Sequence, residues 1–274
     1  MADASFSTGP APGFPPHDHI AGHEGIGRVV QSYDPSLLGR VVGIRYLGGT
    51  CGSCAYCARL GLPTSCAAQL NIPKHVGGTF QEYATVPTSC LVALPHESIQ
   101  DELGAAATAT ATTAGLCAAL CSGSAALMAL RAAGIVDGAG GGGGGGKVVV
   151  VVVVSGVGGA IGHLAGAMAR RVFGARVVGV DVGPKCDVLR AMAGLDQGHY
   201  YADVLLDAPA CEATGDQAWT DFAGELGKAC AALRGDHEET PRMADAVVVC
   251  AGEPDAFRNL DGYVCDGGRI VCVG

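Results

Sequence analysis

The middle of the chain contains the feature that most restricts the fold, seven consecutive valines followed at once by a glycine-rich turn. The valines, Val148–Val154, are all β-branched, which is typical of a strand buried on both faces of a parallel sheet. The turn, Ser155–Gly162, leads into a small-residue helical segment, His163–Phe173. A second apolar strand, Ala175–Val180, ends at Asp181. This order of strand, turn, helix and strand predicts a βαβ unit of an α/β fold.

The glycine turn predicts a dinucleotide site. Glycines let the backbone turn tightly and approach a pyrophosphate, while the helix that follows directs its N–H groups at the phosphates. Asp181 lies 19 residues past Gly162, where an acid would bind a ribose 2′-hydroxyl and repel a 2′-phosphate, so NAD is favoured over NADP. The spacing G-x-x-G-x-x-G departs from the commoner G-x-G-x-x-G, and the alternative is an α/β turn without a ligand. The candidate cofactor-binding residues are Gly156, Gly158, Gly159, Ala160, Ile161, Gly162, Asp181 and Lys185.

Composition restricts the class of protein. A length of 274 residues suits two domains, and a net charge of −9 argues against a nucleic-acid or anionic-membrane partner. Residues 1–22 lack the basic start and apolar core of a secretory signal, and the valine run is too short to cross a bilayer. We therefore expect a cytoplasmic protein. In that compartment, 13 cysteines indicate metal ligation and small buried side chains rather than disulfides.

Four cysteines lie within sixteen residues, at Cys51, Cys54, Cys57 and Cys66. Four thiolates close the tetrahedral coordination shell of zinc and leave no position for water, which is the pattern of a structural site. The alternatives are four unrelated cysteines and a redox Cys-x-x-Cys, but the βαβ surroundings that would support a redox motif are absent from this region. The spacing predicts a structural zinc.

The remaining patterns predict two domains, residues 1–122 and 123–274, with a flexible glycine-rich linker at 134–146. The first domain is expected to be rich in strands up to residue 92 and to end in Ala-rich helices between 100 and 131. In the second, five sheet strands alternate with helices. The expected strands after Asp181 are 199–202, 246–250 and 269–273, and the expected helices are 185–193, 218–233 and 254–263.

Together these motifs resemble the medium-chain zinc-containing alcohol dehydrogenases, in particular the yeast-type microbial branch. The matching segments are Gly22-His-Glu-Gly-Ile-Gly27, the four-cysteine loop, Gly78–Ala84, Cys121, the glycine turn and Asp181. The resemblance implies a GroES-like, β-rich catalytic domain followed by a Rossmann-type doubly wound parallel sheet. It also implies zinc-dependent, reversible oxidation of an alcohol to an aldehyde or ketone, with hydride transfer to NAD.

The resemblance also assigns roles at a catalytic zinc. His23 and Cys121 correspond to two of its ligands, and Glu24 to a neighbouring acid that can approach the metal. Asp3 corresponds to the acid that fixes the histidine tautomer. Cys51, Cys54, Cys57 and Cys66 correspond to the structural zinc lobe.

The family's remaining catalytic ligand is a cysteine that would fall one position before Met1, and its sixth sheet strand would follow Gly274. We therefore expect a chain truncated at both ends. One alternative function is a catalytically impaired dinucleotide-binding remnant that retains only the structural zinc. Another is a quinone or enoyl reductase without catalytic zinc, although such enzymes typically lack the cysteine lobe. The alcohol that serves as substrate and the presence of a homo-oligomer stay open.

Overall fold

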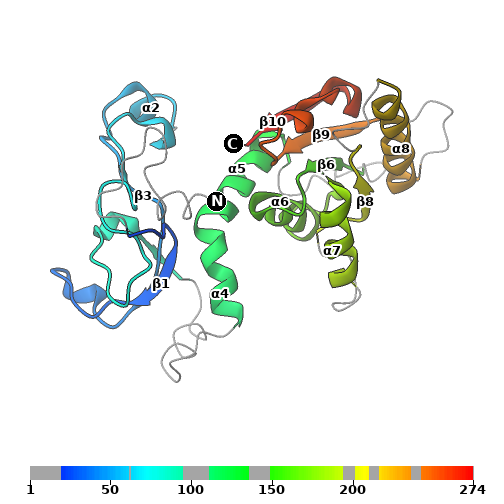
Figure 1. Cartoon of the computed structure of the whole chain (residues 1–274). Coiled ribbons are helices and arrows are strands. Elements are labelled where there is room, and N and C mark those ends of the chain that lie inside the picture. Colours follow the sequence, from blue (N-terminus) through cyan, green and yellow to red (C-terminus); the bar gives the residue numbers. More distant parts are fainter. Residues whose placement is uncertain are drawn as a thin grey trace, which may run out of the picture. The chain divides into compact units, whose positions relative to one another are not determined.

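The computed structural model describes residues 20–61, 63–94, 111–135, 149–193, 201–209, 216–235 and 242–273. The chain divides into two compact units, Met1–Cys121 and Ser122–Gly274. Figure 1 shows that the first is built mainly of short strands and loops, and the second of a sheet with helices around it.

The second unit contains a five-stranded, entirely parallel sheet in the order β10-β9-β6-β7-β8. Its strands are β6 (Val151–Ser155), β7 (Arg176–Asp181), β8 (Val204–Asp207), β9 (Ala244–Val249) and β10 (Val264–Cys272). The chain runs outward from β6 through β7 to β8 and then returns to the other side of β6, which is the doubly wound order. The predicted Rossmann-type sheet, with five strands in the described residues, is confirmed.

Helices cover both faces of this sheet, which explains the unbroken valine run. The helices are α5 (Ser124–Ala132), α6 (Ala160–Arg171), α7 (Gly183–Ala193) and α8 (Asp216–Arg234). Val152 and Val154 belong to a core shared with residues of α5 and α6, whereas Val151 and Val153 belong to a second core shared with α8. Because successive side chains of a strand point to opposite faces, both faces require apolar residues here.

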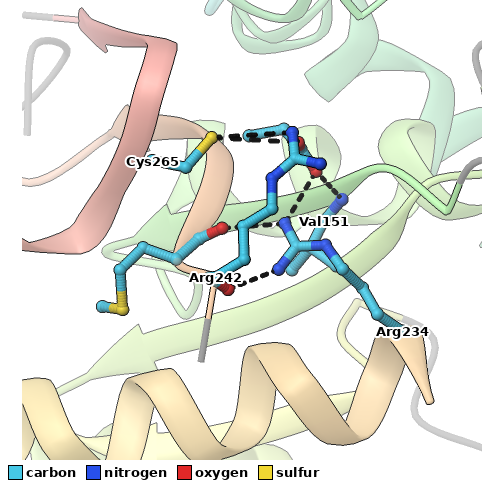
Figure 2. Close-up of polar contacts among 6 residues, drawn as sticks. Val151, Arg234, Arg242 and Cys265 are labelled. Atoms are coloured by element: carbon cyan, nitrogen blue, oxygen red, sulfur yellow. Dashed lines mark hydrogen bonds and ion pairs between the residues drawn. The ribbon is translucent and has the colours of Figure 1, made fainter. Parts of the chain in front are cut away.

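A cluster of charged side chains joins three elements where β6 and β9 begin (Figure 2). The Oδ2 atom of Asp245, on β9, accepts the Val151 N–H of β6 at 2.7 Å and lies 2.9 Å from Nη2 of Arg234, at the end of α8. The other carboxylate oxygen lies 2.7 Å from Nη2 of Arg242. Asp245 therefore ties α8 to two neighbouring strands.

The first unit holds a three-stranded antiparallel sheet, β1-β2-β5, and a two-stranded pair, β3-β4. The strands are β1 (Gly25–Arg28), β2 (Val41–Ile44), β3 (Leu47–Gly49), β4 (Leu70–Asn71) and β5 (Leu91–Ala93). The short helix α2 (Ala55–Ala58) lies in the cysteine loop, and 3-10 turns occur at Pro35–Leu37, Pro63–Ser65 and Thr88–Cys90. Helix α4 (Ala111–Ala118) continues into a π-helical turn, η4 (Ala119–Gly123), that leads to α5.

The strand predicted at 199–202 was placed too early. Residues 199 and 200 lie outside the described residues, and the strand observed is β8, which starts at Val204. Asp203 exchanges bonds with the start of β7: its N–H donates to the Val177 carbonyl, and its carboxylate accepts the Val177 N–H. Pairing of Val204–Asp207 with β7 follows from there.

The helix predicted at 254–263 is wrong as a single element. Two 3-10 turns, Pro254–Phe257 and Leu260–Tyr263, take its place, separated by Asn259 in a left-handed conformation with φ 51°. In the first unit, the stretch 78–87 contains no regular strand, although Gly78, Thr79 and Phe80 donate backbone bonds to Ile20–Gly22. The linker prediction for 136–146 falls outside the described residues.

One helical stretch in the described part of the chain, Gly115–Ala132, is long and apolar enough to cross a membrane by length and composition alone. A single stretch of this kind is weak evidence for a membrane span, because helices of soluble proteins pass the same test.

Candidate functional site

The structure brings the four cysteines of the loop together. Their Sγ atoms all lie within 4.8 Å of one another. The Cys54 and Cys57 sulfurs are 3.5 Å apart and those of Cys51 and Cys66 are 3.6 Å apart. A zinc ion with Zn–S bonds of about 2.3 Å places tetrahedral sulfurs roughly 3.8 Å apart, so this donor set fits structural zinc without rearrangement.

Local backbone geometry prepares the loop for anionic sulfur. The Cys54 N–H points at the Cys51 sulfur at 3.3 Å, and the Cys51 N–H points at the Cys66 sulfur at 3.5 Å. Hydrogen bonds from the backbone at Ser53 and Cys54 lower the pKa of the Cys51 thiol to about 6. Desolvation, followed by the Cys54 thiol, raises the pKa of Cys57 to about 11. A cation would have to offset the charge that accumulates when all four thiols ionise.

A second group of metal-binding side chains consists of His23, Glu24 and Cys121. One ligand atom from each lies within 4.8 Å of the others, and all three residues are half-buried. Imidazole, carboxylate and thiolate are all zinc ligands, and catalytic zinc sites commonly use three protein ligands. The donor set present therefore fits a zinc ion.

Backbone contacts hold the His23–Glu24 segment in place. Gly22 has φ 96°, and a Cβ there would lie 2.5 Å from Thr79 Oγ1 and 2.8 Å from the Phe80 N atom, so the segment passes close to residues 79–80 only because of the glycine. Thr79 donates its hydroxyl to the Glu24 carbonyl at 2.5 Å. The stretch Gly78–Phe80 therefore acts as a support for the two site residues.

Cys121 enters the group from the π-helical turn η4. Its backbone N–H donates to Glu24 Oε1 at 3.1 Å, across 97 residues of sequence. A π turn displaces one residue from the regular helical ladder, and such turns are frequent at functional sites. In the helix just before it, burial and then the charge of Glu24 raise the pKa of Cys117, which lies outside the group.

The glycine turn of the second unit has the geometry that a dinucleotide requires. Gly156 has φ 78°, and a Cβ on Gly162 would lie 2.0 Å from the Gly156 carbonyl oxygen. Gly159 caps helix α6, which begins at Ala160 and includes Ile161. Glycines at 156, 158 and 159 bring no side chain of their own to the start of the helix, which favours the approach of a phosphate to its first N–H groups.

Asp181 ends strand β7 beside this turn and is 7% exposed. Its Oδ2 atom accepts the Gly158 N–H at 2.8 Å, and its Oδ1 atom accepts the Val182 N–H at 2.9 Å. The Lys185 ammonium lies 3.6 Å from Oδ1. These bonds hold the carboxylate next to the glycine turn, where it can accept the hydroxyls of a ribose.

Asp3 lies outside the described residues. The residues that sequence patterns missed are Tyr46, whose ring meets the His23 imidazole edge-on with centroids 6.1 Å apart, and the buried Asn71 bonded to it. Neither belongs to a spaced motif, and the contact between them spans 25 positions, so no local signal marks it.

The chain is similar in sequence and fold to known alcohol dehydrogenases. The alcohol dehydrogenase GroES-like domain family model matches residues 2–96. Alcohol dehydrogenase 1 of Emericella nidulans is 29% identical over 260 residues, which cover 93% of this chain and 60% of the relative. An alcohol dehydrogenase of Geobacillus stearothermophilus is 30% identical over 180 residues, which cover 65% of this chain and 45% of the relative.

The chain is therefore similar to alcohol dehydrogenases over most of its length, and its first part matches their GroES-like domain. Solved structures share its fold: an NAD-dependent alcohol dehydrogenase superposes with a TM-score of 0.62 at 23% identity, covering 96% of this chain and 62% of the other. Alcohol dehydrogenase TADH from Thermus sp. ATN1 gives a TM-score of 0.63 at 20% identity, with 96% and 64% coverage. The predicted GroES-like and Rossmann-type organisation is confirmed. The chain spans about 60% of the length of two curated relatives that it matches, alcohol dehydrogenases 1 and 2 of Emericella nidulans.

Proposed function

We propose that this chain is the substrate- and cofactor-binding part of an NAD-dependent zinc alcohol dehydrogenase, which oxidises an alcohol to an aldehyde or ketone reversibly. The observation that carries the proposal is the convergence of His23, Glu24 and Cys121 within 4.8 Å. We assign residues 1–122 to the catalytic domain and residues 123–274 to NAD binding.

The residues have separate tasks in this reaction. His23 Nε2 or Nδ1, the Cys121 thiolate and a Glu24 oxygen would hold a catalytic zinc, and the four-cysteine loop would hold a structural one. Zinc supplies a Lewis acid that lowers the pKa of an alcohol hydroxyl, and NAD supplies the hydride acceptor. The sulfur and carboxylate bring negative charge to the site, which favours retention of a divalent cation.

Glu24 and Asp181 orient the two sites. Glu24 accepts the Cys121 N–H at 3.1 Å and so fixes the backbone from which the thiol projects. Asp181 is held by two backbone N–H groups, which leaves its carboxylate facing the place of the adenosine ribose while the N-terminus of α6 takes the pyrophosphate. An acid at this position repels a 2′-phosphate, which favours NAD.

Metal analysis combined with an alcohol assay tests the proposal. The full chain should bind close to two zinc ions and form NADH when given NAD and a small primary or secondary alcohol. Cys121→Ser should reduce the metal content towards one and abolish NADH formation, whereas NADH binding should persist. One zinc per wild-type chain, with NADH binding but without turnover, would instead identify the remnant that retains only structural zinc.

We further propose a cytoplasmic location and a small-molecule alcohol or aldehyde as the partner. The net charge of −9 supports the absence of a nucleic-acid partner, since the phosphate backbone selects basic surfaces.

A further inference from the structure

Polar side chains meet at the β3–β4 pair, outside the proposed ligand set. Asn71, on β4, is 5% exposed and is paired with Leu47 of β3. Tyr46 precedes β3, Gln69 precedes β4, and His75 follows it in a turn. Burial of a polar side chain is costly unless its hydrogen bonds are satisfied. The cluster therefore calls for a physical explanation.

In this cluster, the side-chain amides of Gln69 and Asn71 donate hydrogen bonds to oxygen atoms of their neighbours. Gln69 donates its Nε2 hydrogen to the Thr64 carbonyl, which turns its Oε1 atom towards Asn71. Asn71 Nδ2 then donates to Gln69 Oε1 at 2.9 Å and to the Tyr46 hydroxyl oxygen at 3.0 Å. Both amide hydrogens are used, so the Tyr46 oxygen acts as an acceptor in this bond.

The backbone fixes Asn71 in this orientation. Its N–H donates to His75 Nδ1 at 2.9 Å, and its carbonyl accepts the His75 N–H at 2.8 Å. The next residue, Ile72, donates its N–H to the Tyr46 carbonyl at 3.0 Å. Asn71 and Tyr46 are thus joined through backbone and side chain alike, and the amide has little freedom to turn.

Tyr46 in turn faces the candidate catalytic group. Its ring stands at 88° to the His23 imidazole, with centroids 6.1 Å apart. A tyrosine ordinarily ionises at about pH 10, so the phenol carries its hydrogen at neutral pH. Because the phenol oxygen accepts a hydrogen bond from Asn71, the phenol hydrogen can donate to a different acceptor.

We propose that Asn71 is a positioning residue for the His23 site: it orients the Tyr46 phenol so that its O–H donates to the oxygen of an alcohol or carbonyl compound bound beside His23. This rests on the proposed alcohol dehydrogenase function. The arrangement also explains an unfavourable feature, because Asn71 Oδ1 is buried without a hydrogen-bond partner in the described part of the chain. Such a group persists where orientation matters more than stability.

A double-mutant cycle between Asn71→Asp and Tyr46→Phe tests the proposal. Aspartate has the shape of asparagine but offers no N–H, and its carboxylate would capture the phenol hydrogen. Each single variant should lower kcat/KM for the alcohol about fivefold, the size of one neutral hydrogen bond. If Asn71 acts through Tyr46, the double variant loses no more than Tyr46→Phe alone. Losses that multiply would overturn the proposal.

A second measurement needs neither metal nor turnover. Asn71 holds the phenol oxygen in place, so its removal should displace that oxygen, seen in a crystal structure of the variant. Asn71→Leu, which removes the donor without adding charge, serves if Asn71→Asp fails to fold. A phenol oxygen in its wild-type position in a folded variant also overturns the proposal.

Gln217→Glu is the matched control, because it is the same amide-to-acid type of change on the exposed face of α8, and it should leave both readouts unaltered. The two proposals fail differently. If the wild-type chain forms no NADH with any alcohol, the proposed function fails, while the position of the Tyr46 phenol in the variant still decides whether Asn71 orients it.

Discussion

Asn71 and Asp181 are two of the buried polar residues in the described part of the chain, at 5% and 7% exposure. Each lies at a proposed site, and each is oriented by bonds to its neighbours: Asn71 by Gln69 and His75, Asp181 by backbone N–H groups. Burying such groups costs stability unless they are bonded, so their presence indicates positions where orientation has been retained for binding.

We predict that Asp181→Ala weakens NADH binding at least tenfold and narrows the preference for NADH over NADPH. The variant loses charge-assisted bonds to ribose worth about 1.5–3 kcal/mol and removes the repulsion of a 2′-phosphate. Fluorescence titration with both cofactors measures this. Asp187→Asn, an exposed acid on the next helix, is the control and should bind like wild type. Equal losses in the two variants would remove the role assigned to Asp181.

We predict that Asp207 makes a small contribution to the free energy of unfolding, and that this contribution is lost in acid. Its hydrogen bonds to Arg190 lower the pKa of its carboxyl below the usual value. A lowered folded-state pKa means that the stabilisation is present above the unfolded pKa of about 3.9 and is lost as the pH falls through the folded value. Because both side chains are well exposed, Asp207→Asn should cost under about 1 kcal/mol at pH 7. Urea unfolding should show a larger difference between the variant and the wild type at pH 7 than at pH 2.5.

At the scale of elements, the close approach of helix α6 to the glycine turn depends on Gly162. The Cβ of an alanine at Gly162 would lie 2.0 Å from the Gly156 carbonyl oxygen, so the helix could not keep its distance from the turn. By contrast, a Cβ at Gly224, within α8, meets nothing within 4 Å. Alanine substitutions at Gly162 and Gly224 therefore distinguish the effect of close packing from the effect of helix propensity.

We predict that Gly162→Ala lowers NADH affinity at least tenfold, because the first turn of α6 is displaced from the pyrophosphate position. Gly224→Ala should bind NADH normally and gain up to about 1 kcal/mol of stability, as alanine is the better helix former. NADH titration and thermal unfolding of the pair decide this. Normal binding by Gly162→Ala would show that α6 can shift without cost to the site.

We predict that Asp245→Asn destabilises the second unit by about 2–3 kcal/mol. The change leaves Arg234, whose side chain is 6% exposed, without its carboxylate partner at the junction of α8, β6 and β9. Removing one partner of a buried pair is strongly destabilising. Asp187→Asn, whose carboxylate is 76% exposed, should change stability by under about 0.5 kcal/mol in the same urea experiment. A similarly small loss of stability in both variants would contradict the role given to Asp245.

Sequence patterns predicted what short-range rules determine. The valine run predicted the central strand, the glycine spacing predicted the turn, and the four-cysteine spacing predicted sulfurs that the structure does bring together. Patterns failed where a distant partner decides the outcome. Strand β8 starts where Asp203 bonds to Val177. The helix expected at 254–263 is interrupted because the backbone of Asn259 is left-handed, and the spacing of apolar residues does not reveal that conformation. The Asn71–Tyr46 bond is of the same kind.

At the scale of the whole molecule, two compact units carry the two kinds of site. The metal-binding groups lie in Met1–Cys121 and the glycine turn lies in Ser122–Gly274. A ligand that binds only the folded form stabilises the unit that holds its site.

We predict two thermal transitions for the zinc-loaded chain. Chelation of the metal should lower the melting temperature of one transition, and NADH should raise that of the other, since each ligand stabilises its own unit. Differential scanning calorimetry with chelator, with NADH and with both measures this. A single transition that responds to both ligands would show that the units unfold together.

The contact between Glu24 and the Cys121 amide has a consequence for biosynthesis. Its two ends are separated by 97 residues, whereas the four loop cysteines span only positions 51 to 66. On the ribosome, the loop can therefore capture a metal ion while most of the chain is still unmade. The His23 group must wait until its last member has emerged and the intervening chain has closed around it. The two ions would be loaded in sequence, the structural one first.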